Sequence, residues 1–399
     1  MNNIRKPLKI DGFFVLPESK ALPLLEGINN AKKNIDISVF HIGSKQIGDC
    51  LIRALERNVN IRIMVNFEFQ YDKCESLLIK KFIDYINQNI RNSDLLSNIN
   101  YFWSSPKFLF SKQRFILIDH KNNDNDFQFT EGITKCFILT GDLLSNNNMY
   151  TKEETSFYSK RDFQILLYSP RNKHLIESIY KSFSADLNNA PYLLSQIEDS
   201  FPLIWSNGML DAETKDWTVN LAKNNFSSKK FLSQGNAFEE ILTLINNSTQ
   251  KLIITTKGIS SIVILKALSS ALKRGVTIII LADKKNTVSF KNLYLLCSLG
   301  AEIFLISQDS VFQQNAEYII CDHELALIGT ISLTDESLFE NKELSVLTDS
   351  LILINTLYST FYKDLQHLEV YSMKIKTLED IIESKINKVD YEQLEFLEE

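Results

Sequence analysis

The chain runs through one succession of helices and strands twice, and this repeat constrains the fold more than any other feature. Residues 31–40 and residues 247–256 each join the end of a helix to a short strand. Each is followed by a helical stretch with apolar residues four positions apart, which are Ile47, Leu51 and Leu55 and then Ile264, Leu268 and Leu272. The period is too long for a solenoid repeat, so the sequence predicts two fused halves of similar fold.

The strands that follow keep the same order in both copies. A second strand is predicted at residues 59–65 and again at residues 275–281, and an extended segment follows at 99–103 and 301–306. Strands that alternate with helices are typical of βαβ units. We therefore expect an α/β fold in which each half is a mainly parallel sheet flanked by helices.

The last strands of the two copies differ in spacing. The strands that end in Asp119 and Asp322 lie 203 residues apart (322 minus 119), whereas those that end in Gly141 and Gly329 lie 188 apart (329 minus 141). The polar stretch 121–135 accounts for the difference, and its composition predicts a loop that is present only in the first copy.

We expect the chain to divide into four parts. These are a first half (1–187), a connector (188–232), a second half (233–370), and a C-terminal helix with an acidic tail (371–399). The helix is predicted over 374–389, where apolar residues fall on one side.

Several short segments of the two copies resemble, in their order along the chain, motifs of the phospholipase D superfamily, in its cardiolipin-synthase-like branch. They are Ala31-Lys32-Lys33 with Ile47-Gly48, Arg161-Asp162, Lys273-Arg274-Gly275-Val276, and the segment Gly329 to Thr334 with Asn341 and Glu343. The resemblance covers roughly residues 20 to 187 and 235 to 366. It implies two phospholipase D-like repeats that pack as a pseudo-twofold pair.

The motif that carries the chemistry of this family is HxKxxxxD, once in each half. The resemblance implies a histidine nucleophile, a second histidine as proton donor, and lysines that stabilise the phosphoryl oxygens. The matching positions here are Lys112, Arg114 and Asp119 in the first half and Asn315, Glu317 and Asp322 in the second. Both histidines are therefore replaced.

The replacements remove the chemistry of the family. Lys112 is protonated at an ordinary pKa of about 10.4, and Asn315 can neither attack phosphorus nor carry a proton. Glu317 puts a negative charge where the family has a cation. In the polar segment of the first half, Asp142 takes the place of a hydroxyl and Leu144 that of an amide. We expect no catalytic residue among the motif positions, and no metal or cofactor.

The motif positions remain candidates for binding a phosphate group. The ligand-binding residues that the resemblance implies are Lys112, Arg114, Thr330, Ser332, Asn341 and Glu343. The alternative is that Lys112 and Arg114 pair with Asp142, Glu317 or Glu343 in an internal ion network.

Three histidines are alternative catalytic candidates. His41 ends the first strand, on the side of the sheet where α/β proteins bind ligands. Its counterpart region in the second half is Lys257-Gly258, which contains no histidine. His120 and His323 follow the motif aspartates, and we expect them at turns because neighbours on a strand face opposite ways.

Composition limits the partners. The net charge of −6 disfavours broad binding to nucleic acid. The five cysteines form no CxxC pair, which disfavours a zinc site or a disulfide framework. No signal peptide or membrane-spanning run is evident, so we expect a chain that is cytoplasmic as synthesised. The candidate partner is a phospholipid head group or another phosphate ligand, and no protein partner can be named.

Two function hypotheses follow. The first is a catalytically inactive phospholipase D-like protein that acts as a binding or scaffolding module. The second is an active phosphodiesterase or phosphatidyltransferase with a rearranged site. The glutamate-rich tail, residues 391–399, also resembles the translocation signals of bacterial type IV effectors, so a secreted bacterial effector is a further hypothesis.

Overall fold

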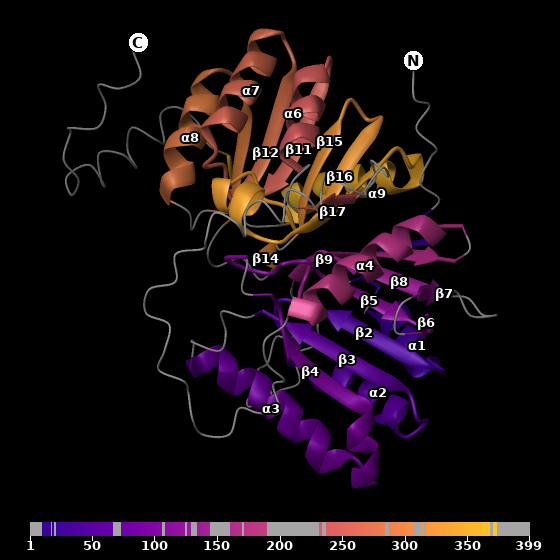
Figure 1. The fold of residues 1–399 in the computed structure, drawn as a ribbon. Coiled ribbons are helices and arrows are strands. Elements are labelled where there is room, and N and C mark those ends of the chain that lie inside the picture. Colours follow the sequence, from indigo (N-terminus) through magenta and orange to yellow (C-terminus); the bar gives the residue numbers. More distant parts are fainter. Residues whose placement is uncertain are drawn as a thin grey trace.

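A computed structural model describes most of the two predicted halves. The described residues are 10–16, 18–19, 21–66, 73–105, 108–123, 126–128, 134–143, 160–169, 171–189, 231–233, 237–283, 287–306, 313–314, 316–367 and 370–372. The halves lie one above the other, with the first half in indigo to magenta and the second in orange to yellow (Figure 1).

The first half is built on one sheet with the strand order β1-β9-β8-β5-β2-β3-β4, and β14 pairs with β9. Its strands are β1 (Gly12–Leu16), β2 (Asn34–Ser38), β3 (Asn60–Val65), β4 (Ile99–Trp103), β5 (Phe115–Ile118), β8 (Lys135–Leu139) and β9 (Lys160–Tyr168), with β14 (Gln313–Gln314) from the second half. Its helices are α1 (Leu22–Asn29), α2 (Lys45–Leu55), α3 (Lys73–Asn89), the 3-10 helix η2 (Ser93–Asn98) and α4 (Lys173–Asn189).

The second half repeats this plan with the strand order β10-β17-β16-β15-β11-β12-β13-β18. Its strands are β10 (Phe231–Ser233), β11 (Lys251–Thr256), β12 (Thr277–Asp283), β13 (Glu302–Ile306), β15 (Glu317–Cys321), β16 (Leu325–Gly329), β17 (Leu344–Thr348) and β18 (Val370–Ser372). Its helices are α6 (Ala237–Asn247), α7 (Ile262–Lys273), α8 (Thr287–Ser298), the short π-helix η5 (Glu336–Glu340) and α9 (Leu351–His367).

The predicted fold class is confirmed, but the sheets are mixed rather than mainly parallel. Only β2-β3-β4 and β11-β12-β13 pair in parallel within their own halves, and these are the strands that helices connect. The strands β5, β8 and β9 and their counterparts β15, β16 and β17 pair antiparallel. Antiparallel neighbours need no crossover helix, so the alternation of helices and strands predicted only the first part of each sheet.

The helix α2 shows why the periodic stretches become helices. Ser44 caps its first turn by accepting a hydrogen bond from the backbone N–H of Ile47 at 3.4 Å. Ile47, Leu51 and Leu55 are all fully buried against the sheet, as their spacing predicted. In the second half Ile264 and Leu268 of α7 are buried in the same way.

The polar stretch 121–135 is not a simple loop. It contains a two-stranded hairpin of β6 (Lys121–Asn123) and β7 (Asp126–Gln128), and its last residue begins β8. The prediction of a loop was wrong for these strands because a polar, asparagine-rich composition does not exclude strand pairing.

The register of the repeat also differs from the sequence alignment. Thr140 donates its backbone N–H to Phe163, and Thr330 makes the same bond to Leu344. Leu143 and Leu333 form equivalent bridges to the segments after β2 and β11. Both pairs lie 190 residues apart (330 minus 140, 333 minus 143), so the offset of 188 taken from two glycines was wrong.

The two glycines are not equivalent in the structure, because each leaves space for a different neighbouring residue. Aligning them with each other in the sequence was therefore misleading. A side chain on Gly141 would meet the carboxylate of Asp162, whereas one on Gly329 would meet Ser345 and the backbone of Leu344. In the structure Asp142 therefore corresponds to Ser332, and not to Thr330.

The two halves share a core. One cluster of buried side chains joins Phe115 and Phe163 of the first sheet with Tyr318 of the second, together with residues of α4 and α9. The strand β14 adds to β9, and its counterpart segment at Ser111 forms a bridge to Lys342. Figure 1 shows β14, β9 and α4 where the halves meet, a level we call the junction.

Some predictions fall outside the described residues. These are Asn315, Leu144, most of the connector 188–232, the helix predicted over 374–389 and the tail 391–399. The four-part division of the chain stays a prediction. Within the described residues, no helix has both the length and the apolar character needed to cross a membrane.

Candidate functional site

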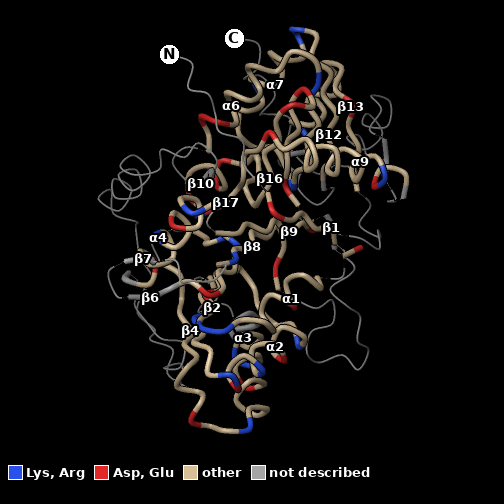
Figure 2. Tube along the Cα trace, turned by 90° about the vertical axis from the view of Figure 1, so that its right-hand side faces the viewer, with Lys and Arg blue, Asp and Glu red and all other residues tan. Residues whose placement is uncertain are grey.

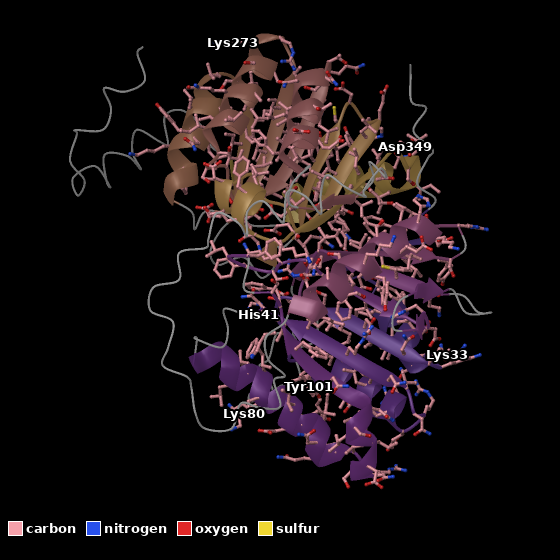
Figure 3. The ribbon with its side chains drawn as sticks, in the orientation of Figure 1. Lys33, His41, Lys80, Tyr101, Lys273 and Asp349 are labelled. Atoms are coloured by element: carbon pink, nitrogen blue, oxygen red, sulfur yellow. The ribbon has the colours of Figure 1, made fainter. Side chains whose placement is uncertain are left out.

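The motif residues before β5 and at the start of β15 lie at the ends of the two sheets that face the junction. Arg114 directly precedes β5, and Glu317 is the first residue of β15. Lys112 is tied to the other half because its backbone N–H donates to the carbonyl of Lys342 at 2.8 Å. Figure 3 labels His41 at this level of the first half.

Arg114 is bound by a carboxylate of its own half. Its Nε donates to Asp142 Oδ1 at 2.7 Å and its Nη2 to Oδ2 at 3.1 Å, a bidentate pair. Burial works to raise the pKa of Asp142, but the charge of Arg114 and hydrogen bonds from His41 and Arg114 outweigh it and hold that pKa well below its usual range. The guanidinium is thus neutralised where the family has a phosphate-binding lysine.

His41 completes this group. Its Nδ1 lies 3.2 Å from Asp142 Oδ2, and its backbone N–H donates to Oδ1 at 3.2 Å. The imidazole packs edge-on against Phe40, and its side chain is 20% exposed. Of the three candidate histidines, His41 is therefore the one that the structure brings to the motif residues.

Lys112 lies close to Glu343 of the second half. Its Nζ is 3.9 Å from Glu343 Oε1, and its side chain is 32% exposed. Burial lowers the pKa of Lys112, and nearby Lys257 and Arg114 act in the same direction, whereas Glu343 opposes the shift. Lys112 is the more accessible of the two motif cations.

Glu317 occupies the position equivalent to Arg114 in the second half. Its carboxylate accepts a hydrogen bond from Ser332 Oγ at 2.7 Å and from the backbone N–H of Lys257 at 3.1 Å. Burial raises the pKa of Glu317, and Lys257 and Ser332 reduce this shift without reversing it. The two equivalent positions therefore carry opposite charges. Arg114 in the first half is a cation beside the carboxylate of Asp142, and Glu317 in the second half is an acid beside the hydroxyl of Ser332.

Glu343 is held by its own half. Its Oε1 accepts from Ser337 Oγ at 3.0 Å and from Asn341 Nδ2 at 3.1 Å. Thr330 is occupied with the backbone, because its hydroxyl accepts from the N–H of Leu344 at 3.0 Å. Thr140 does the same for Phe163, so this threonine shapes the strand end in both halves.

The motif aspartates lie at the opposite ends of the motif strands. Arg114 and Asp119 are five residues apart on a strand, roughly 16 Å. Asp119 accepts the backbone N–H groups of Lys32 and Lys33 at 2.8 Å. Asp322 accepts those of residues 249, 250 and 251. The aspartates therefore stabilise the turns before β2 and β11, and this structural role explains why both copies contain one.

His120 and His323 accompany these aspartates and lie away from the motif cations. His120 is buried, and its Nε2 lies 2.7 Å from Asp36 Oδ2, which also binds Arg62. His323 is exposed, and its Nε2 lies 2.7 Å from Asn355 Oδ1. Neither geometry supports a relocated catalytic histidine.

Some of the charged residues at the junction were missed by sequence reasoning. Lys257 was named only as the region opposite His41, yet its backbone and charge act on Glu317. Lys342 and Asp186 form a buried pair across the junction, with Nζ 2.5 Å from Oδ2. Basic and acidic residues are interspersed over the molecule in the view of Figure 2. The described residues hold no cluster suited to a metal ion.

Comparisons with known proteins agree with this architecture. The family described as cardiolipin synthase, PLD-like domain, matches residues 24–141 and 241–365. The phosphatidylserine synthase of Haemophilus influenzae Rd KW20 has the same fold at a TM-score of 0.66 and 14% identity, over 96% of this chain and 95% of that one. No curated protein sequence matches the chain.

A second solved structure matches only in part. The polyphosphate kinase of Porphyromonas gingivalis has a TM-score of 0.58 and 12% identity, over 93% of this chain. The match spans only 52% of that kinase, so it concerns about half of a longer protein. The family match covers most of both halves, and the chain therefore belongs to the family of cardiolipin-synthase, phospholipase D-like domains, with one copy in each half.

Proposed function

We propose that the chain is a catalytically inactive member of this family that works as a binding or scaffolding module. The observation that carries the proposal is the bidentate pairing of Arg114 with Asp142. It neutralises one motif cation, while Glu317 puts an acid in the place of the other. With neither motif histidine present, the site lacks both the nucleophile and the proton donor of the family.

We further propose that the ligand contains a phosphate group. Lys112 supports this proposal because its side chain is partly exposed. In contrast to Arg114, its charged group makes no hydrogen bond to an acid among the described residues. The names of both structural neighbours, a phosphatidylserine synthase and a polyphosphate kinase, refer to phosphate compounds. A phospholipid head group and a free phosphate ester both offer this chemistry.

The test combines an activity assay with calorimetry. Pure protein should release no product from a phosphodiester and transfer no phosphatidyl group. It should bind inorganic phosphate or glycerophosphate, and Lys112→Ala/Arg114→Ala should lose this binding. The matched control is Lys32→Ala/Lys33→Ala, which removes the same charge at exposed positions far from the junction. Turnover by the wild type would contradict inactivity, and equal binding by all three proteins would contradict the site.

An active enzyme with a rearranged site is the second candidate, and the His41–Asp142 contact favours it. A carboxylate that holds one imidazole nitrogen can orient the ring as a general base or nucleophile. This reading requires turnover that His41→Ala abolishes while the fold is preserved. Turnover that survives His41→Ala, or no turnover at all, would contradict it.

A role as a secreted bacterial effector stays a prediction from the acidic residues 391–399. Removal of residues 390–399 should stop export from a bacterium with a type IV system if these residues are a translocation signal. Unchanged export would contradict it.

A further inference from the structure

Lys112 and Glu343 face each other at the junction without forming a hydrogen bond. The 3.9 Å between Lys112 Nζ and Glu343 Oε1 is longer than a hydrogen bond. Among the described residues, no acceptor is hydrogen-bonded to the Lys112 ammonium, which lies 5.4 Å from the centroid of the Phe110 ring. A cation with three donors therefore lies beside a carboxylate that it does not satisfy.

Glu343 lacks a hydrogen-bond donor, just as Lys112 lacks an acceptor. The residue is 1% exposed, and its Oε2 has no hydrogen-bond donor among the described residues. Asn341 Oδ1 beside it is also buried without a donor. A buried acceptor left unpaired costs about 1–3 kcal/mol, so this part of the site is suited to a group that brings a hydrogen.

A ligand that satisfies both residues must accept from Lys112 and donate to Glu343. A phosphate group that still carries one proton does both, because it has bare oxygens and one P–OH. A phosphodiester or a sulfate is fully deprotonated at neutral pH and offers Glu343 only acceptors, which a buried carboxylate repels.

We propose that Lys112 and Glu343 form a site selective for a protonated phosphate group, as in a phosphomonoester monoanion, over phosphodiesters and sulfate. This inference rests on the phosphate-binding function proposed above and names the class of ligand.

The charged surroundings fit this selectivity. Lys257 also acts on Lys112 and supplies positive potential toward an anion. Glu317 and Glu343 are the acids that act on Lys112, and Asp142 neutralises Arg114, so the cations and acids at the site nearly balance. A balanced site binds a monoanion with less electrostatic penalty than a dianion.

The experiment is calorimetric titration of the full chain with glycerol 3-phosphate, dimethyl phosphate and sulfate at pH 6 and pH 8. A phosphomonoester has its second pKa near 6, so its protonated fraction falls about 50-fold between these values. We expect its affinity to fall about tenfold or more, and sulfate and the diester to bind at least tenfold more weakly at pH 6. Sulfate stays a dianion at both pH values, so it also reports any pH-dependent change in the protein itself.

The key variant is Glu343→Gln, which keeps the shape and replaces an acceptor by a donor. It should lose the pH dependence and bind sulfate and glycerol 3-phosphate alike. Glu336→Gln, an exposed acid on η5, is the matched control and should behave as wild type. If Glu343→Gln does not fold, the affinities of the wild type for the three ligands still test the proposed selectivity.

The outcomes separate the two proposals. Binding of all three anions with equal affinity would overturn the selectivity and leave phosphate binding in place. No binding of any anion would overturn both.

Discussion

Arg161 on β9 and Asp364 on α9 lie 203 residues apart in the chain and form a buried two-point ion pair between the halves. Arg161 Nε donates to Asp364 Oδ2 at 2.9 Å, and Nη2 to Oδ1 at 2.6 Å. The Lys342–Asp186 pair repeats this contact in the opposite direction, from the second half to the first. The junction is thus closed by two crossed ion pairs related by the pseudo-twofold repeat.

Breaking one crossed pair should destabilise the whole chain. Asp364→Ala leaves the Arg161 guanidinium with Glu18 as its remaining carboxylate partner, so we expect a loss of about 1–3 kcal/mol. Urea unfolding measures this loss. Lys363→Ala, on the exposed neighbouring lysine, is the control and should cost less than about 1 kcal/mol. An equal loss in the two variants would show that the pair does not hold the halves.

Glu317→Gln should change how stability depends on pH. Burial raises the pKa of Glu317 in the folded chain above the unfolded value of about 4.3. The folded state then binds more protons, so stability is full below about pH 4.3 and falls as pH rises through the folded pKa. The amide variant should therefore lose this decline and gain relative stability at pH 8, on the order of 1 kcal/mol.

Thermal unfolding of both proteins at pH 4 and pH 8 checks this prediction. Glu324→Gln, on an exposed acid of the same half, is the control and should follow wild type at both values. A gain that is the same at pH 4 and pH 8 would mean that titration of Glu317 is not its cause.

The motif aspartates should matter for stability and not for ligand binding. Asp119 lies at φ 57° and accepts two backbone N–H groups, so Asp119→Ala loses both a cap and a residue suited to this backbone, at a cost of about 1–3 kcal/mol. Asp119→Asn should be milder, because asparagine tolerates positive φ and can still accept. Phosphate affinity, measured where each variant is folded, should be unchanged. A loss of affinity in Asp119→Asn would place this residue in the site.

Removing the counter-ion of Arg114 should strengthen anion binding while it weakens the fold. Asp142→Asn leaves the buried Arg114 guanidinium without its carboxylate, so its charge becomes available to a phosphate. We expect about a tenfold gain in phosphate affinity, together with a loss of roughly 3 kcal/mol in stability. Calorimetry and urea unfolding measure the two effects. Glu56→Gln, on a distant acid of the first half, controls for net charge, and weaker binding by Asp142→Asn would contradict the prediction.

Local patterns predicted the elements of the repeat because each element is encoded by neighbours in the chain. The four-residue spacing of Ile47, Leu51 and Leu55 predicted α2, and the mainly apolar segment 99–103, in which Asn100 is polar, predicted the bounds of β4. Both signals depend on burial of one face or of a whole strand. The family likeness rested on the same local segments and was confirmed.

The contacts that close the site could not be predicted in this way. Asp142 was matched to the wrong residue, because a two-residue shift of a short strand end leaves the composition nearly unchanged. Arg161 was recognised as a motif residue, but nothing in the sequence indicates that its partner is Asp364 on the far helix. Antiparallel pairing of β5, β8 and β9 was also missed, since direction depends on the turns between strands.

The crossed arrangement of the junction has a consequence for how the chain is held together. Each half gives the other a short strand segment, at β14 and at Ser111, and one partner of each buried ion pair. Neither copy has a complete sheet edge by itself, and among the described residues Lys342 and Asp186 each find their charged partner only in the other half. Two separately translated copies should accordingly assemble into one heterodimer.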